Sequence, residues 1–240
     1  MGALAGQGVV GTVRLILKNI VHEWRWWLDR SIDRRLGTDT SGQISLDTLS
    51  IDSANTAHGV YYEPTPTRLL KRMFNNLKVD RQAFHLVDLG SGKGRVLLVA
   101  ATSGFAATTG IEFARELHAV AQQNSVKLRT RFPGSAPMNC VWGDAAHFDF
   151  PLGDLVIFAY NPFEEPVMKE VMQRLEASLT SRPRRVVLIY YNDRPAAVRA
   201  CPSLCRRAGL ELPFDRTRVV QRPAAIYSNF ALEAGPDWTL

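Results

Sequence analysis

Cysteine is scarce in this sequence, and its pattern excludes two classes of protein. Only three cysteines, Cys140, Cys201 and Cys205, occur among 240 residues. Three thiols cannot all pair within one chain, so a disulfide-stapled secreted scaffold is excluded, and we expect reduced thiols in a cytoplasmic protein. Cys201 and Cys205 lie four positions apart, but no second pair of Cys or His residues accompanies them. Because structural zinc needs four such ligands, we expect no metal site.

Long apolar runs are also missing. No stretch of about 18 uncharged apolar residues occurs, so the sequence predicts no membrane-spanning helix. The first residues lack the basic start of a secretory signal and carry Arg14 inside their apolar stretch, so we expect this segment to be retained. The formal net charge of +6 mildly favours an anionic partner or surface.

An N-terminal segment, residues 8–36, has the pattern of an amphipathic helix. Its apolar residues recur at steps of three and four positions, with Arg and Lys between them. Two interpretations remain open: this helix packs on the main domain or a partner, or it lies on an anionic membrane surface. We therefore expect residues 1–36 to be a helical extension. Residues 37–59, rich in Ser, Thr, Asp and Gly, are predicted to link it to a domain of residues 60–240.

Beyond residue 60, strand-like and helix-like segments alternate. Short apolar runs predict strands at 84–89, 106–111, 138–142, 154–160 and 184–191, and two late strands at 216–221 and 224–233. Helices are predicted at 95–103, 113–129, 164–179 and 194–209. This alternation is typical of an α/β fold with a doubly wound, mostly parallel sheet. The two late strands lie close together in the sequence and predict an antiparallel hairpin at one edge.

The strongest functional signal is a glycine loop of the form D-x-G-x-G-x-G. It comprises Asp88, Gly90, Gly92 and Gly94, begins at the end of a predicted strand and opens a predicted helix. In an open α/β sheet, ligands bind at this carboxyl end of the strands. Glycine has no Cβ, so the main chain can adopt positive φ and approach a ligand closely. The pattern therefore predicts contact between backbone and ligand.

Neighbouring residues restrict the kind of ligand. A dinucleotide loop has a glycine where this sequence has Arg95, and a triphosphate loop needs Ser or Thr after Lys93, where Gly94 stands. Glu112 ends the second predicted strand, where a carboxylate can accept hydrogen bonds from both hydroxyls of a ribose. Asp144 follows the third strand, at the rim of the same crevice. Acids around a glycine loop would repel phosphates, so they favour a cationic nucleoside without phosphates.

Residues 60–240 resemble the class I methyltransferases that use S-adenosylmethionine, in both the content and the order of these motifs. The loop sequence DLGSGKGR is closest in style to that of the seven-strand protein-lysine N-methyltransferases. The resemblance implies a seven-strand sheet whose last strand inserts antiparallel. It also implies that the loop, Ser91 included, holds the methionine and ribose of the cofactor S-adenosyl-L-methionine. Glu112 would then bind the ribose hydroxyls, and Asp144 the adenine amine.

Three residues after the fourth predicted strand, Asn161, Pro162 and Phe163, are candidate catalytic residues that face the methyl acceptor. They resemble the N-P-P-[FY] motif of methyltransferases that act on adenine or glutamine nitrogen, without its second proline. An Asn amide and a main-chain carbonyl fixed by Pro can hold an amine in line with a methyl group. An aromatic face can contact a cationic group. Alternatively, Asn161 only caps the helix that begins near Glu164.

The sequence therefore predicts an enzyme, an S-adenosylmethionine-dependent methyltransferase that N-methylates an amine such as a protein lysine. Two alternatives remain open. One is N-methylation of a nucleic-acid base, which the positive charge favours and the incomplete proline motif disfavours. The other is a catalytically silent module that binds a membrane or a partner. Tyr61 and Tyr62 are candidates for closing over the cofactor, and Tyr190 and Tyr191 for lining the acceptor pocket, with core packing as the alternative role of each.

Overall fold

The computed structural model describes residues 30–45, 48–50, 62–160, 162–191, 194–210 and 224–232. Asn161, Tyr61, most of the predicted N-terminal helix and the predicted strand at 216–221 lie outside these residues. None of the described helices is both long enough and apolar enough to cross a membrane.

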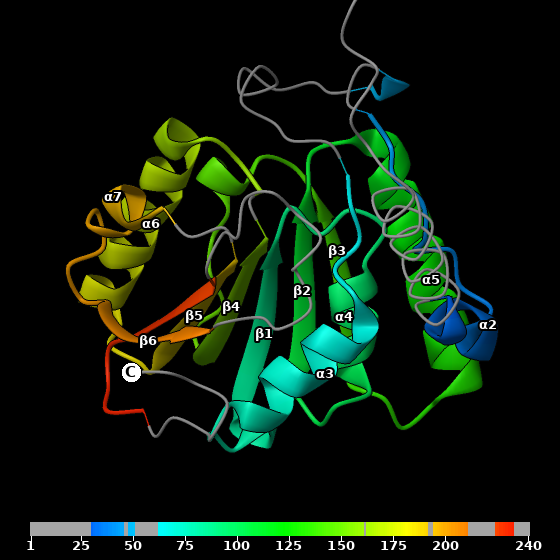
Figure 1. The fold of residues 1–240 in the computed structure, drawn as a ribbon, viewed down its shortest axis with the longest axis horizontal. Coiled ribbons are helices and arrows are strands. Elements are labelled where there is room, and N and C mark those ends of the chain that lie inside the picture. Colours follow the sequence, from blue (N-terminus) through cyan, green and yellow to red (C-terminus); the bar gives the residue numbers. More distant parts are fainter. Residues whose placement is uncertain are drawn as a thin grey trace, which may run out of the picture.

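A seven-strand sheet forms the centre of the molecule, in the order β3-β2-β1-β4-β5-β7-β6 (Figure 1). The strands are β1 (Phe84–Leu89), β2 (Ala107–Glu112), β3 (Met138–Trp142), β4 (Asp154–Tyr160), β5 (Val186–Tyr191), β6 (Cys205–Leu210) and β7 (Ala224–Ser228). The first five run parallel, whereas β7 is antiparallel to both β5 and β6. The predicted fold class is confirmed, since the sheet is mostly parallel and ends in an antiparallel pair at one edge.

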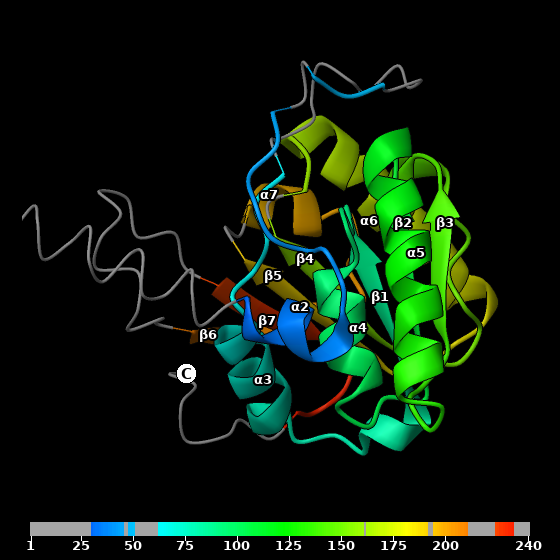
Figure 2. The same ribbon diagram turned by 90° about the vertical axis from the view of Figure 1, so that its right-hand side faces the viewer.

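Helices cover both faces of this sheet (Figures 1 and 2). They are α2 (Ser31–Leu36), α3 (Thr67–Asn76), α4 (Arg95–Ala101), α5 (Arg115–Arg131), α6 (Glu165–Ser181) and α7 (Pro195–Val198), with 3-10 turns η3 (Arg81–Ala83) and η4 (Ala145–His147). Buried residues of α2, α3 and α4 share one core cluster with one side of the sheet, and those of α6 and α7 share a second cluster with the other side. The sheet is therefore doubly wound.

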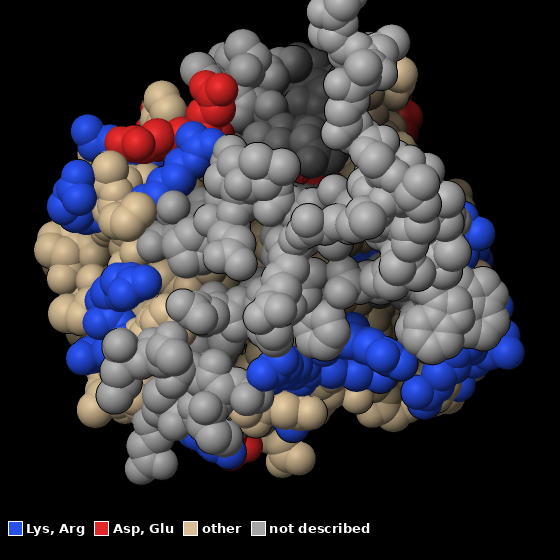
Figure 3. Space-filling model, in the orientation of Figure 1, with Lys and Arg blue, Asp and Glu red and all other residues tan. Residues whose placement is uncertain are grey.

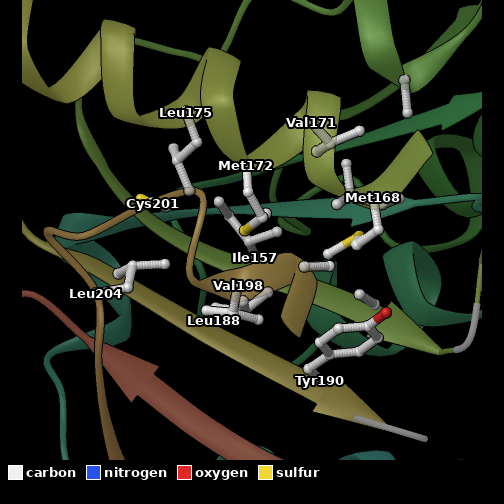
Figure 4. Packing of buried hydrophobic residues seen from close by; sticks show 14 of the residues in the cluster. Ile157, Met168, Val171, Met172, Leu175, Leu188, Tyr190, Val198, Cys201 and Leu204 are labelled. Carbon is white, nitrogen blue, oxygen red and sulfur yellow. The ribbon is translucent and has the colours of Figure 1, made fainter. Parts of the chain in front are cut away.

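The second cluster explains why the central strands are apolar along their whole length. Met168, Met172 and Leu175 of α6 point toward Ile157 of β4 and Leu188 of β5 (Figure 4). Because helices lie on both faces, successive side chains of a central parallel strand are all buried, and the strand needs no polar alternation. This burial is what made β4 and β5 recognisable as continuous apolar runs in the sequence.

One predicted helix is largely wrong. The sequence predicts a helix over 194–209, but α7 ends at Val198 and Cys205–Leu210 forms β6. Pro202 lies between the two elements, and a proline inside a helix removes a hydrogen bond and clashes with the preceding turn. The outer strand of the antiparallel edge pair thus comes from residues with a helix-like apolar pattern.

The described end of the N-terminal helical segment packs on the domain. Ile32 and Leu36 of α2 are buried in the same core cluster as Leu70 and Phe74 of α3. Such packing is what the first interpretation of residues 8–36, a helix packed on the main domain or a partner, predicts for the described residues 30–36. The expected domain boundaries at residues 36 and 59 remain predictions.

Gly110, in the middle of β2, allows the glycine loop and α4 to approach the sheet. A Cβ at this position would lie 2.5 Å from the Ser91 side chain and 2.6 Å from Leu97 Cδ1. We expect Gly110→Ala to lower the free energy of unfolding by about 1–3 kcal/mol, because overpacking forces neighbours out of their preferred positions. Urea denaturation measures this change. Gly134→Ala is the matched control, since a Cβ there meets nothing within 4 Å; equal losses in the two variants would contradict the packing argument.

Candidate cofactor site at the carboxyl edge of the sheet

The glycine loop connects β1 to α4, and its three glycines have left-handed backbone conformations. Gly90, Gly92 and Gly94 have φ values of 74°, 52° and 83°. The amides of Gly90 and Ser91 both donate to the Ile111 carbonyl at 3.0 Å, and the Gly94 amide donates to the Ser91 carbonyl at 2.8 Å. These bonds hold the loop against the end of β2, the strand that carries Glu112. The structure therefore brings the first two predicted cofactor motifs together.

Two side chains lie against this loop. A Cβ on Gly92 would overlap the ring of Tyr62, and a Cβ on Gly90 would lie 3.0 Å from Pro162 Cβ. The Tyr62 hydroxyl donates to the Thr40 carbonyl at 2.7 Å, which fixes the ring in place. Tyr62 therefore lies against the glycine loop, its role in closing over the cofactor stays a prediction, and Pro162 brings the turn after β4 to the same loop.

Asp88 and Glu112 form a buried acidic pair. Their exposed fractions are 3% and 4%. Glu112 Oε2 accepts from the Gly92 amide at 2.7 Å, and Oε1 accepts from the Ala114 amide at 2.8 Å. Within the described ranges, neither carboxyl group forms an ion pair with Lys or Arg. The surrounding described side chains therefore offer this pair no positive counter-charge.

Burial changes the acidity of both groups. Desolvation raises the pKa of Glu112 to about 7, although backbone hydrogen bonds from Ala114, Gly92 and Phe113 act in the opposite direction. The pKa of Asp88 is raised well above its usual value, first by burial and then by the nearby Glu112. Such a pair binds a proton, a cation or hydrogen-bond donors more favourably than an exposed carboxylate does.

Asp144 lies at the neighbouring strand end. The Gly143 amide donates to the Glu112 carbonyl at 3.0 Å, so the turn after β3 lies beside the end of β2. Asp144 is half-buried, and its Oδ1 accepts from the Ala146 amide at 2.9 Å, which caps η4. The predicted cofactor residues thus follow three adjacent strands at one edge of the sheet.

Trp142 belongs to the same edge and was not singled out from the sequence. It is 44% exposed, opposite Glu112 in the register of β2 and β3. Its Nε1 donates to the Phe113 carbonyl at 3.0 Å, and the Arg115 guanidinium lies 4.5 Å from its ring centroid. A tryptophan at the end of a predicted strand was the only sequence signal available, and it is a weak one, because its exposure is visible only in the structure.

The candidate acceptor residues are separated by the structure. Phe163 is 6% exposed and packs in the core cluster beneath α6, whereas Pro162 lies at the glycine loop. At the carboxyl ends of β4 and β5, Tyr160 and Tyr191 stack with ring centroids 4.5 Å apart and an interplanar angle of 26°. Tyr190 is buried in the opposite cluster. The side chain of Phe163 is therefore directed into the core, whereas the stacked tyrosines lie at the strand ends that border the turn.

Basic side chains gather elsewhere. Figure 3 shows Lys and Arg over α2 and α3, toward the amino ends of the strands. Exposed members of this basic surface include Arg30, Arg34, Arg35, Arg68 and Lys71. Within the described residues, no group of three or more His, Cys, Asp or Glu could hold a metal ion. The described basic side chains over α2 and α3 therefore lie toward the opposite ends of the strands from the acidic pair.

The strand order, the antiparallel last strand and the glycine loop after β1 define the class: the chain has the fold of the class I S-adenosylmethionine-dependent methyltransferases. A family model, described as histone methylation protein DOT1, matches residues 47–135. That range runs from ahead of α3 through the glycine loop and Glu112 to the end of α5. No curated protein matches the chain.

Several solved structures resemble the fold. An RNA methyltransferase from Salinibacter ruber in complex with S-adenosyl-L-homocysteine is 21% identical over 69% of this chain and 92% of that chain, with a TM-score of 0.45. A ribosomal protein L11 methylase from Lactobacillus delbrueckii subsp. bulgaricus is 14% identical over 68% and 77%, with a TM-score of 0.47. A precorrin-6y C5,15-methyltransferase from Geobacter metallireducens GS-15 is 13% identical over 76% and 92%, with a TM-score of 0.46. These three names describe different methyl acceptors.

Proposed function

We propose that this protein is an S-adenosylmethionine-dependent methyltransferase that acts on an amine nitrogen of a protein. The buried pair Asp88 and Glu112, beside a glycine loop at the carboxyl edge of the sheet, carries the proposal. A buried carboxylate is costly unless a cation or hydrogen-bond donors accompany it. S-adenosylmethionine supplies positive charge and two ribose hydroxyls and has no phosphate, so the acidic pair fits it better than a dinucleotide.

In this proposal, each residue is assigned a role that its position supports. Each Glu112 carboxylate oxygen already accepts one backbone hydrogen bond and retains a lone pair for a ribose hydroxyl. The glycine loop offers close backbone approach to the methionine part, and Asp144 is assigned to the adenine amine. When bound, the cofactor supplies an electrophilic methyl group on its sulfonium. The protein contributes orientation and exclusion of water.

Two observations support an amine acceptor on a protein. The family model that matches residues 47–135 describes histone methylation proteins. Tyr160, half-buried and stacked on the buried Tyr191, offers part of an aromatic ring beside the turn that carries Pro162, and aromatic faces attract alkylammonium groups. The amine attacks through its lone pair, so it must first lose a proton to water. In this proposal, Asn161 and Pro162 orient the neutral amine.

A nucleic-acid base is the second candidate acceptor. The basic surface over α2 and α3 favours it, since Lys and Arg neutralise phosphates and release counterions. Affinity for RNA or DNA that falls steeply with rising salt, together with methylation of a base, would select this candidate. Cofactor binding without turnover on any acceptor would instead select the catalytically silent module.

The experiment for the proposed function combines calorimetry with transfer of an isotope-labelled methyl group to a panel of proteins and nucleic acids. Glu112→Ala should weaken S-adenosylmethionine binding by about 10- to 100-fold, the value of one or two hydrogen bonds to a charged group. Glu116→Ala is the control, because this exposed carboxylate of α5 contacts Ser50 rather than the glycine loop. Equal affinity in wild type and the Glu112 variant would contradict the cofactor assignment, and label only in nucleic acid would contradict the protein acceptor.

A further inference from the structure

We propose that the residues from Asp33 to Ser41, called the 33–41 segment, position the glycine loop for cofactor binding. This proposal rests on the proposed function. Lys93 and Arg95 flank Gly94, and both side chains are buried against this segment, with exposed fractions of 7% and 2%. The two basic side chains of the loop therefore bond to the 33–41 segment, and these bonds attach the loop to it.

Arg95, the first residue of α4, makes the deepest attachment. Its Nε donates to Thr40 Oγ1 at 2.8 Å and its Nη2 donates to Ser41 Oγ at 3.0 Å. Its Nη2 also lies 3.6 Å from Asp33 Oδ2. Burial lowers the pKa of Arg95 to about 10, so the guanidinium still carries its charge at neutral pH. A buried guanidinium is tolerated only where such partners are present, so this set of contacts has a defined geometry.

Asp33 holds the partners of Arg95 in place. Its Oδ1 accepts from Thr40 Oγ1 at 2.7 Å and from the Thr40 amide at 3.1 Å. Its Oδ2 accepts from Ser41 Oγ at 2.7 Å. The Asp33 carboxylate thus orients both hydroxyls that accept hydrogen bonds from Arg95. The turn after α2 therefore binds the first residue of α4 through side chains that are already held in place.

Lys93 makes the second attachment, on the other side of Gly94. Its Nζ donates to Asp39 Oδ1 at 3.0 Å and to the Ser41 carbonyl at 3.0 Å. The Asp39 carboxylate is 61% exposed, so its ion pair with Lys93 adds little to overall stability. We therefore expect the ion pair between Asp39 and Lys93 to act mainly on the position of Lys93 and of the glycine loop that carries it.

Asn124 of α5 joins the segment to the loop from a third direction. Its side-chain amide donates to the Asp39 carbonyl at 2.8 Å and to the Lys93 carbonyl at 2.9 Å, and its Oδ1 accepts from the Asp39 amide at 3.0 Å. Asn124 is fully buried. One side chain thus fixes the backbone of both partners at the same point.

These attachments matter because the loop is rich in glycine. Glycines have more conformational freedom than other residues, and ordering them upon binding would reduce the affinity for a ligand. Fixing Lys93 and Arg95 orders the loop before the cofactor arrives. Residues of the 33–41 segment are therefore positioning residues, which act on the cofactor through the loop.

The test uses Asp39→Ala, which removes an exposed carboxylate and keeps the backbone bonds to Asn124. We expect S-adenosylmethionine affinity to fall by about 3- to 10-fold, and hydrogen exchange of the amides of residues 90–94 to become faster in the free protein. Asp149→Ala is the matched control, because Asp149 also pairs with a basic side chain at 2.9 Å, but its partner is Arg174 of the distant helix α6. This control should change neither quantity.

A double-mutant cycle separates positioning from general destabilisation. Lys93→Met should weaken cofactor binding by a similar factor, and the double variant with Asp39→Ala should bind no worse than either single variant. Unchanged affinity, unchanged loop exchange or additive losses would each overturn the proposal. If the wild-type protein binds no S-adenosylmethionine, the proposed function fails, whereas loop exchange in the free Asp39→Ala protein still decides whether the segment orders the loop.

Discussion

Gly92→Ala is expected to weaken S-adenosylmethionine binding by at least about 100-fold while leaving the protein folded. At φ 52°, a side chain at this position incurs the left-handed penalty, about 1–2 kcal/mol. Its Cβ would also overlap the Tyr62 ring, whose hydroxyl is anchored on the Thr40 carbonyl. The ring must then move, or the loop must, and either movement displaces the backbone that approaches the cofactor. Isothermal calorimetry measures the affinity, and circular dichroism checks the fold.

Gly104→Ala is the control that separates the effect of backbone strain from the effect of overlap with a neighbouring side chain. Gly104 also has a positive φ, 90°, but a Cβ there meets nothing within 4 Å. Both alanine variants should therefore lose a similar amount of stability from the backbone alone, and only the Gly92 variant should lose cofactor binding. Normal affinity in Gly92→Ala would show that the loop does not contact the ligand as proposed.

Asp88→Asn is expected to make the protein more stable at about pH 8 and less able to bind the cofactor. The carboxyl groups of Asp88 and Glu112 have folded-state pKa values above their usual ones. The folded state therefore keeps protons that the unfolded state releases. The stability that these neutral carboxyls contribute is fully present below their unfolded pKa values, and it is lost as the pH rises through the Glu112 pKa of about 7.

The amide that Asp88→Asn introduces cannot ionise, so this variant should lose less stability over the same pH interval. We expect the gain in the free energy of unfolding, relative to wild type, to be larger at about pH 8 than at about pH 5. Urea denaturation at both pH values, without cofactor, measures this difference. Asp149→Asn, which alters an exposed carboxylate in an ion pair, is the control and should show no such gain. A variant that is less stable than wild type at the higher pH would contradict the argument that ionisation of the buried pair destabilises the folded protein.

Much of the candidate cofactor site could be predicted because the sequence signals for it are local. The glycine spacing after β1, and single acids at the ends of β2 and β3, lie within or next to the elements that place them. Parallel strands bring their carboxyl ends to one edge, so the order of Asp88, Glu112 and Asp144 in the sequence was enough to group them. The continuous apolar runs of β4 and β5 likewise follow from burial on both faces.

Other features depend on contacts between distant parts of the chain. No local pattern shows that Arg95 bonds to Thr40, since the two residues are 55 positions apart in the sequence. The same holds for Tyr62 against Gly92, for Phe163 in the core instead of beside the acceptor, and for the altered acidity of the buried carboxyls. These features arise from packing and desolvation, which do not exist until the chain is folded.

The outer edge of the sheet illustrates the same division. Residues 194–209 have a helix-like apolar spacing, but pairing with β7 makes part of them a strand, because ladder hydrogen bonds outweigh a weak helical preference. The sequence by itself determined the parallel α/β class, the glycine loop and the acids at its strand ends, since periodicity and residue chemistry act locally. Only the tertiary structure decided which residues form β6, which segment holds the glycine loop and how acidic its neighbours are, because each of these depends on burial among elements far apart in the chain.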